Sequence, residues 1–186
     1  MKVGVITCHK VYNYGASLQS YALQHYLKKQ GIKVYLINYL PDTFRSKYNL
    51  FFVREDRRKI IKKFPILKLL MPLSNRQMLI TWGRKRAFNE FDTKYIELSP
   101  LSYSSINELR KNPPVADIYI AGSDQVWNTD MNNGRDASYF LDFGDERVKR
   151  ISYAASFGIS NIKEEYKTPI KEWLKRFEAI SRSEER

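Results

Sequence analysis

The sequence is poor in cysteine and has no long hydrophobic run. Cys8 is the only cysteine among 186 residues, which excludes an internal disulfide framework and indicates a reducing compartment. The apolar run within the N-terminal stretch MKVGVITCHK is too short for the hydrophobic region of a signal peptide. No segment approaches the roughly 20 apolar residues that a membrane-spanning helix needs. We therefore expect a soluble protein of the cytoplasm.

Several well-known chemical motifs are also missing. The sequence contains no G-x-G-x-x-G dinucleotide fingerprint, no phosphate-binding G-x-x-x-x-G-K-[ST] loop and no G-x-S-x-G turn. Two histidines and one cysteine without ligand spacing do not make a zinc site. Cys8 and His9 are adjacent, but a catalytic pair depends on spatial geometry that adjacency does not supply. The sequence therefore predicts no metal and no bound cofactor.

Positive charge is abundant and unevenly distributed. The net charge is +12, and residues 43–90 alone carry 13 Lys and Arg against 3 Asp and Glu. Such a segment is usually a solvated helical face, and no nucleic-acid motif accompanies it, so we expect no nucleic acid as a partner. An acidic glycan, a lipid diphosphate carrier or the inner surface of the membrane, contacted peripherally through residues 43–90, are further interpretations.

The hydrophobic pattern predicts an α/β fold. Residues 2–7 and 32–41 are predicted strands, and residues 16–30 between them are a predicted helix followed by Gly31. This order is a βαβ unit and implies a parallel sheet. The residues expected on one face of the helix are Leu18, Tyr21, Ala22, Tyr26 and Leu27.

The remaining chain continues this pattern around a basic insertion. Helical character over 54–71 and 74–93 predicts a basic helical insertion at about 43–93. After it we expect a short helix at 104–111, strands at 116–121 and 149–157 with a strand or extended chain at 137–143 between them, a helix at 163–179, and a new strand from Ala179 or Ile180. The fold class is α/β, a Rossmann-like parallel sheet flanked by helices in one domain, residues 1–186.

The first predicted strand and helix meet at a candidate ligand site, because open α/β sheets bind ligands at the carboxyl ends of their strands. Asn13, Tyr14 and Gly15 open the helix after the first strand, and a helix N-terminus favours anions. The alternative is an ordinary turn in which Asn13 is the cap.

The stretch ADIYIAGSDQVWN ends another strand with a polar cluster. Gly122 permits a sharp turn, while Ser123, Asp124 and Gln125 offer hydroxyl, carboxylate and amide groups that suit sugar hydroxyls. Trp127 is a candidate for stacking on a sugar face. The alternative is a helix start capped by Ser123 or Asp124, with Trp127 in the core.

A third strand end carries the small hydroxyl residues Ser152 and Ser156 in SYAASFG. Small side chains allow close approach of a ligand to the backbone. The alternative, a tightly packed strand, is the simpler interpretation of this stretch taken alone.

Together these segments resemble a known family. The stretches KVGVITCHKVYNYGASLQSYALQHYLKKQG, VYLINYLP, IAGSDQVWN, YFLDF and KRISYAASFG are similar, in order and spacing, to the N-terminal half of polysaccharide pyruvyl transferases. The patterns NYGASLQ and GSDQVWN are the most specific. The resemblance covers most of the chain and is weakest over residues 43–90.

The resemblance implies one half of a two-domain transferase of the GT-B type, with the C-terminal donor domain outside this chain. It implies transfer of a pyruvyl group, as a ketal, from phosphoenolpyruvate to hydroxyls of a glycan or lipid-linked sugar in exopolysaccharide biosynthesis. Asn13, Gly15, Gln19, Ser123, Asp124 and Gln125 would line the cleft, with Asp124 as the catalytic base. The alternatives are a GT-B-type glycosyltransferase that uses a nucleotide sugar and a non-catalytic domain that binds anionic glycan or lipid carrier.

Overall fold

The computed structural model describes residues 1–41 and 82–182. The predicted helix over 54–71, the start of the one over 74–93 and most of the basic segment 43–90 lie outside the described residues. The elements that follow are therefore those of the two described parts of the chain.

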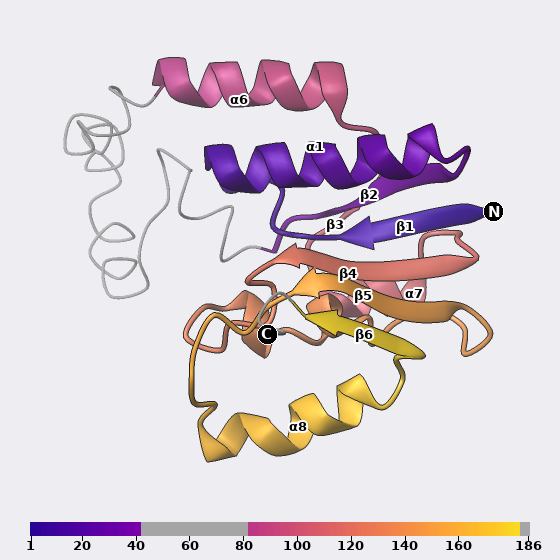
Figure 1. Ribbon diagram of the computed structural model, residues 1–186, viewed down its shortest axis with the longest axis vertical. Coiled ribbons are helices and arrows are strands. Elements are labelled where there is room, and N and C mark those ends of the chain that lie inside the picture. The colour runs from indigo at the N-terminus through magenta and orange to yellow at the C-terminus, as the bar shows by residue number, and fades with distance from the viewer. Residues whose placement is uncertain (42–81, 183–186) are drawn as a thin grey trace, which may run out of the picture.

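A parallel sheet forms the centre of the fold. Its strands are β1 (Lys2–Ile6), β2 (Lys33–Tyr39), β3 (Leu98–Tyr103), β4 (Ile118–Asp124), β5 (Lys149–Ala155) and β6 (Ala179–Arg182). The sheet has six strands in the order β3-β2-β1-β4-β5-β6, and each neighbouring pair is parallel. This arrangement is the Rossmann-like α/β fold that the sequence predicts (Figure 1).

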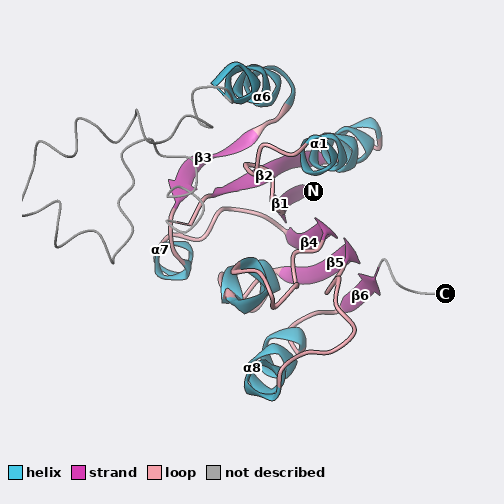
Figure 2. Cartoon of the chain, turned by 90° about the vertical axis from the view of Figure 1, so that its left-hand side faces the viewer, coloured by secondary structure: helices cyan, strands magenta, loops and turns pink. Residues whose placement is uncertain are grey.

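Helices cover both faces of the sheet. The helices α1 (Tyr14–Lys29) and α6 (Trp82–Tyr95) lie side by side on one face. The other face carries α7 (Ile106–Lys111), α8 (Glu164–Leu174) and two short 3-10 turns, η1 (Asn133–Arg135) and η2 (Ala137–Phe140) (Figure 2). A hydrophobic core fills each interface, with Val3, Val5 and Leu23 under α1 and with Ile6, Tyr119 and Trp127 on the opposite side.

The first βαβ unit forms as predicted, with one error. Asn13 caps α1 by accepting a hydrogen bond from the Ala16 backbone N–H, and Gly31 follows the helix with φ of +75°. The predicted apolar face is correct for Tyr21 and Leu27, which pack against the core, and wrong for Leu18 and Tyr26, which are 56% and 61% exposed.

The face of α1 that packs on the sheet is instead built from small and polar residues. Ala16, Ser17, Ser20, Leu23 and Gln24 are its buried members. The Ser20 hydroxyl donates to the Ala16 carbonyl, and the Gln24 amide bonds both backbone groups of Glu97 before β3. These polar groups are satisfied locally, so they can be buried without cost to the helix.

Two predictions in the middle of the chain also need correction. Residues 137–143 are not a strand, because η2 begins under an Asp136 cap and Leu141 adopts a left-handed φ of 57°. The run Tyr139-Phe140-Leu141 is buried on all sides, and a short buried run does not reveal its secondary structure by periodicity. The strand β3 has no counterpart in the prediction, because it contains Pro100; as an edge strand it tolerates proline.

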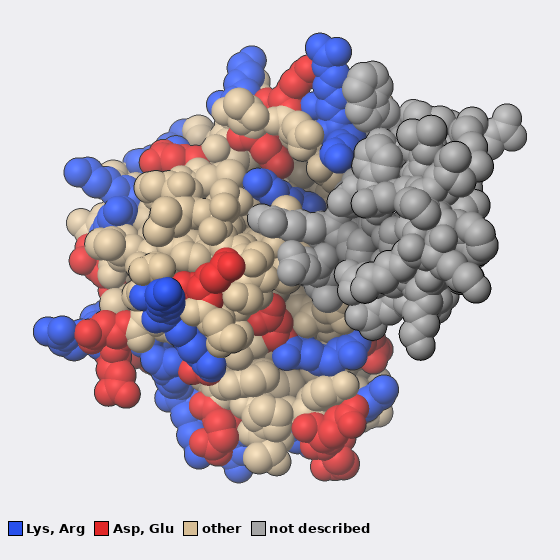
Figure 3. All heavy atoms as spheres, turned by 180° about the vertical axis from the view of Figure 1, so that it is seen from behind, with Lys and Arg blue, Asp and Glu red and all other residues tan. Residues whose placement is uncertain are grey.

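The C-terminal part agrees more closely. The helix α8 ends at Leu174, five residues before the predicted end, and Pro169 lies in its second turn. The strand predicted from Ala179 or Ile180 is β6. Acidic and basic side chains are interspersed over the described surface seen in Figure 3, and pairs such as Lys149–Glu178 at 3.2 Å neutralise one another.

Candidate functional site

The strand order reverses direction between β1 and β4, which places a switch point at their carboxyl ends. Open α/β sheets bind ligands at such a point. Thr7 directly follows β1, while Ser123 and Asp124 end β4. The structure therefore brings two of the three predicted strand ends together with the start of α1.

A closed ring of hydrogen bonds joins β1, α1 and β4 at this point. The Thr7 hydroxyl donates to the Ser123 carbonyl at 3.0 Å, and the Ser123 hydroxyl donates to the Gln19 Oε1 at 2.7 Å. The Gln19 Nε2 lies 3.5 Å from the Thr7 Oγ1. Thr7 is buried, whereas Gln19 and Ser123 are partly exposed.

The backbone of β4 turns sharply at the candidate residues. The Gly122–Ser123 peptide is cis, and Gly122 and Asp124 have φ of +118° and +136°. A Cβ at position 122 would lie 2.2 Å from the Tyr153 carbonyl oxygen, so glycine is required there. The Asp124 carbonyl accepts from the backbone N–H groups of Val126 and Ser156. This turn leaves the Asp124 side chain partly exposed at the end of the strand.

Asp124 and Gln125 keep different amounts of hydrogen-bonding capacity. The Asp124 Oδ1 accepts from the Gln125 N–H at 2.7 Å. The Gln125 carbonyl and Oε1 accept from the amides of Asn133 and Asn128. Gln125 thus holds the following loop in place, although its side chain is exposed.

The start of α1 packs against α6. The Tyr14 ring lies 4.9 Å from the Phe88 ring and under the Arg84 guanidinium at 5.2 Å. Asn13 acts as the cap, and Gly15 is exposed beside it. Asn13, Tyr14 and Gly15 therefore border the switch point, while Gln19, one turn later, enters the ring.

Three predicted site residues lie elsewhere. Trp127 is fully buried, its indole N–H donates to the Tyr139 carbonyl and its ring stacks on Phe140, so it is a core residue and not a platform for a sugar. The Ser152 hydroxyl bonds the backbone of Ser181 and joins β5 to β6.

Ser156 is nearly buried and holds the loop that leaves β5. Its Oγ accepts from the Gly158 N–H at 2.9 Å. Its backbone N–H donates to the Asp124 carbonyl at 3.0 Å. Ser156 therefore supports the turn at Asp124 through the backbone.

The sequence marks Thr7, Cys8 and His9 as unusual residues at the end of the first strand, although the predicted site does not include them. Thr7 is central to the ring, and its signal is its place directly after the buried strand. Burial and, to a smaller extent, the Asp124 carboxylate raise the pKa of the neighbouring Cys8 thiol to about 12, against the opposing effect of a hydrogen bond with Tyr139. A thiol in this state is protonated, which makes Cys8 a poor nucleophile.

His9 is buried beside them with one ring nitrogen unsatisfied. Its Nδ1 lies 3.2 Å from the Thr7 carbonyl, and its Nε2 has no partner in the described part of the chain. Burial lowers the pKa of His9 to about 4, against the opposing effect of the Thr7 carbonyl. His9 is therefore neutral at physiological pH.

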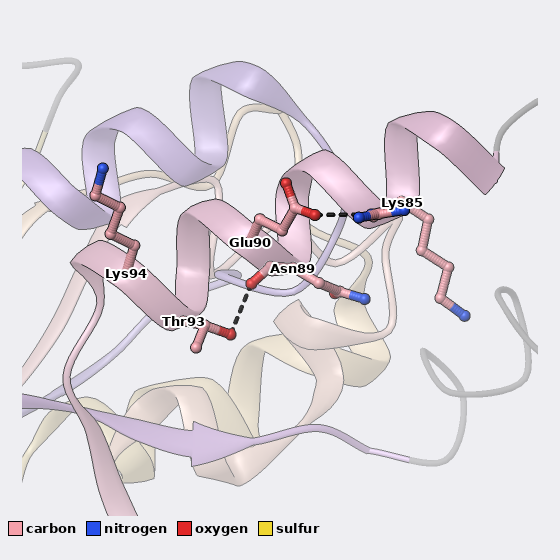
Figure 4. Close-up of a pocket in the computed structure, with 6 residues that line it drawn as sticks. Lys85, Asn89, Glu90, Thr93 and Lys94 are labelled. Atoms are coloured by element: carbon pink, nitrogen blue, oxygen red, sulfur yellow. Dashed lines mark hydrogen bonds and ion pairs between the residues drawn. The ribbon is translucent and has the colours of Figure 1, made fainter.

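Residues 1–41 and 82–182 hold no group of three or more His, Cys, Asp or Glu that could bind a metal ion. None of the described helices is long and apolar enough to span a membrane. A hollow of about 520 Å³ runs along α6, lined by Lys85, Arg86, Asn89, Glu90, Thr93 and Lys94 (Figure 4). Its lining comes from one helix and includes none of the predicted site residues.

Comparison with known protein families identifies the family of this chain. A family model described as polysaccharide pyruvyl transferase matches residues 13–181. The chain belongs to the polysaccharide pyruvyl transferase family. The matched range runs from the cap of α1 into β6 and contains every residue of the predicted site. No curated protein and no solved structure gives a match.

Proposed function

We propose that this polysaccharide pyruvyl transferase moves a pyruvyl group from phosphoenolpyruvate to two hydroxyls of a cell-surface glycan precursor. In this proposal the chain is the N-terminal half of the enzyme and supplies the edge that binds the acceptor sugar. The donor half would follow in a longer chain, as the resemblance to GT-B-type transferases implies. Phosphoenolpyruvate is then a substrate, and no further cofactor is needed.

The observation that carries the proposal is the convergence of Gln19, Ser123 and Asp124 at the switch point of a family member. Hydroxyl, amide and carboxylate groups are suited to sugar hydroxyls. Their location at the carboxyl ends of β1 and β4 is where open sheets bind ligands.

The proposed reaction balances without an oxidant or reductant. Two sugar oxygens form bonds to C2 of phosphoenolpyruvate, while the C2–O bond to phosphate and the carbon–carbon double bond break. One hydroxyl proton ends on the methylene carbon, which becomes a methyl group, and the other leaves with hydrogen phosphate. A base near the hydroxyls and an acid near the methylene carbon would therefore assist.

Asp124 is the proposed base. Its Oδ1 is held by the Gln125 N–H, and its carboxylate is partly exposed at the end of β4. Asp124→Asn keeps the shape and an acceptor for Gln125 but cannot take a proton. We expect the turnover of the version extended through the native gene to fall by about 100-fold or more. Asp130→Asn is the matched control on an exposed residue nearby, and full activity of the Asp124 variant would remove the role.

The acceptor and the place of work belong to the same proposal. We propose a lipid-linked or free glycan as acceptor and the cytoplasm, at the inner face of the membrane, as the location. The basic segment 43–90 would contact that surface by charge. Arg84, Lys85 and Arg86 near the start of α6 are basic residues of its described part and support this choice, although Arg86 also pairs with Glu90 at 2.8 Å. Nucleic acid is not proposed as a partner.

Thermal melting tests the donor. A ligand that binds the folded state alone raises the melting temperature, so this chain and a version extended through the native gene are compared with phosphoenolpyruvate and with nucleotide sugars. Stabilisation of the extended chain by phosphoenolpyruvate supports the proposal. Stabilisation by a nucleotide sugar, without phosphoenolpyruvate, would replace it by a GT-B-type glycosyltransferase. Salt-sensitive glycan binding without turnover would indicate a binding domain.

A further inference from the structure

The ring of Thr7, Gln19 and Ser123 fixes the direction of each of its hydrogen bonds. The Ser123 carbonyl oxygen can only accept, so the Thr7 hydroxyl, 3.0 Å away, must donate to it. A threonine hydroxyl has a single proton. Toward Gln19, therefore, the Thr7 Oγ1 can only accept.

This restriction settles the orientation of the Gln19 amide. The amide atom next to the Thr7 Oγ1 must be a donor, so it is Nε2, at 3.5 Å. The flipped amide would set two acceptors against each other there. The oxygen Oε1 consequently faces Ser123 at 2.7 Å, and the Ser123 hydroxyl must donate its proton to it.

The ring therefore converts a serine hydroxyl, which ordinarily donates or accepts, into an acceptor. The proton of the Ser123 hydroxyl is held by Gln19, and its oxygen keeps lone pairs for a further partner. The next residue, Asp124, is an acceptor as well when ionised, with Oδ1 bound to the Gln125 N–H. Two successive residues at the end of β4 thus offer acceptors to a ligand.

We infer that the Ser123 Oγ binds the acceptor sugar by accepting a hydrogen bond from one of its hydroxyl groups, and that Thr7 and Gln19 hold it in this polarity. The inference rests on the proposed function and specifies the substrate: the ligand is a diol that presents hydroxyl protons to Ser123 and Asp124. Ketal formation requires two hydroxyls, so two neighbouring acceptors fit that requirement.

The same polarity excludes an anionic ligand group at Ser123. The oxygens of a phosphate or carboxylate are acceptors, and they would face the lone pairs of the Ser123 Oγ and the charge of Asp124. The phosphate and carboxylate of phosphoenolpyruvate are therefore bound away from this pair of residues.

Fluorinated sugars distinguish a donating serine from an accepting one. Fluorine can accept weakly but cannot donate, so it replaces a hydroxyl only where the protein donates. The probes are methyl β-galactoside and methyl β-glucoside, with their 4- and 6-deoxy and 4- and 6-deoxyfluoro derivatives. Binding to the full chain is measured by titration of its amide NMR signals.

We expect two hydroxyls, one facing Asp124 and one facing Ser123, to tolerate neither removal nor replacement by fluorine. At the position that faces Ser123, both the deoxy and the deoxyfluoro sugar should bind about tenfold more weakly than the parent. Ser123→Ala should abolish the discrimination at that position and leave the others unchanged. Gln19→Leu should release the Ser123 proton, so that the deoxyfluoro sugar binds better than the deoxy sugar. Ser102→Ala, on an exposed serine at the end of β3, is the control.

Two results would overturn the inference in different ways. Tight binding of the deoxyfluoro sugar with weak binding of the deoxy sugar would show that Ser123 donates, and would leave the proposed function intact. No binding of any glycoside at millimolar concentration would overturn the proposed acceptor together with the inference.

Discussion

The two edges of the sheet treat their polar groups differently. At the amino edge, side-chain donors end on backbone carbonyls: the guanidinium of Arg150 bonds the carbonyls of Leu141, Phe143, Gly144, Asp145 and Val148, and the Tyr119 hydroxyl donates to the Pro114 carbonyl. At the carboxyl edge, the Thr7, Gln19 and Ser123 ring contains two bonds between side chains and one from the Thr7 hydroxyl to the Ser123 carbonyl.

This difference distinguishes polar groups that stabilise the fold from polar groups that remain able to bind a ligand. The donors of Arg150 bond backbone carbonyls of the loop before β5, and Arg150 is 3% exposed. The carboxyl edge retains acceptors at Ser123 and Asp124 and an unsatisfied Nε2 on His9 within the described residues. Hydrogen-bonding capacity that remains at a strand end is what a ligand can use.

The amino edge should therefore tolerate substitution least. Arg150→Met would remove the donor from the carbonyls of Leu141, Phe143, Gly144 and Val148, while the Asp145 carbonyl keeps the Val148 N–H, and we expect a loss of about 3–5 kcal/mol in the free energy of unfolding. Urea denaturation followed by tryptophan fluorescence measures it. Arg147→Met, on an exposed arginine of the same edge, should leave the free energy of unfolding nearly unchanged. Equal effects of the two variants would contradict the assigned role of Arg150.

Trp127 tests where the carboxyl edge ends and the core begins. Trp127→Phe keeps the stacking on Phe140 but removes the N–H that bonds the Tyr139 carbonyl. We expect a loss of about 1–3 kcal/mol in stability and no change in binding of methyl glycosides. Trp173→Phe, on a partly buried ring, is the control. Loss of glycoside binding in a folded Trp127 variant would return this ring to the site.

The fold could be predicted from sequence where each strand is a pure apolar run. The runs before Thr7 and before Gly122 are of this kind, and the capping residue and glycine around α1 mark its ends. The buried face of α1 could not be predicted from the sequence, because Ser17 and Ser20 face the sheet while Leu18 and Tyr26 face outward. Small polar residues can face a sheet when a helix packs closely on it, and the polarity of a residue does not predict how closely the helix packs.

The site shows the same division. A strand end followed by Gly122, Ser123 and Asp124 is visible in the sequence, because polar groups interrupt an apolar run. The contact of Gln19 with Ser123 spans 104 positions, and the role of Thr7 depends on the pairing of β1 with β4. The sequence alone does not decide the place of Trp127, because an aromatic ring near polar residues suits both a sugar platform and a core.

His9 lets the pH dependence of the carboxyl edge be measured. Burial lowers its pKa from 6.5 to about 4, so the unfolded chain takes up a proton between these values while the folded chain does not. The stability that the neutral His9 ring contributes is fully present above pH 6.5 and decreases by up to about 3 kcal/mol as pH falls toward 4. His9→Gln should flatten this part of the stability curve. His25→Gln, on an exposed histidine, should leave it unchanged, and an unaltered slope in the His9 variant would contradict the burial of its ring.

Asp92 on α6 should give the opposite slope and the smallest effect. Burial raises its pKa from 3.8 to about 6, although Lys10, next to His9, lowers it. The folded chain then holds the proton more tightly than the unfolded chain. Protonated Asp92 therefore contributes stability that is fully present below pH 3.8 and is lost as pH rises through 6. Because the Asp92 side chain is partly exposed, solvent screening limits the effect to about 1 kcal/mol or less. Asp92→Asn should therefore be slightly more stable than the parent at pH 7–8 and equal to it below pH 4, as measured by thermal melting beside the exposed control Glu90→Gln. A destabilised Asp92 variant at pH 8 would mean that Lys10 and Asp92 form a stabilising pair, and the carboxyl edge would then extend its polar network onto α6.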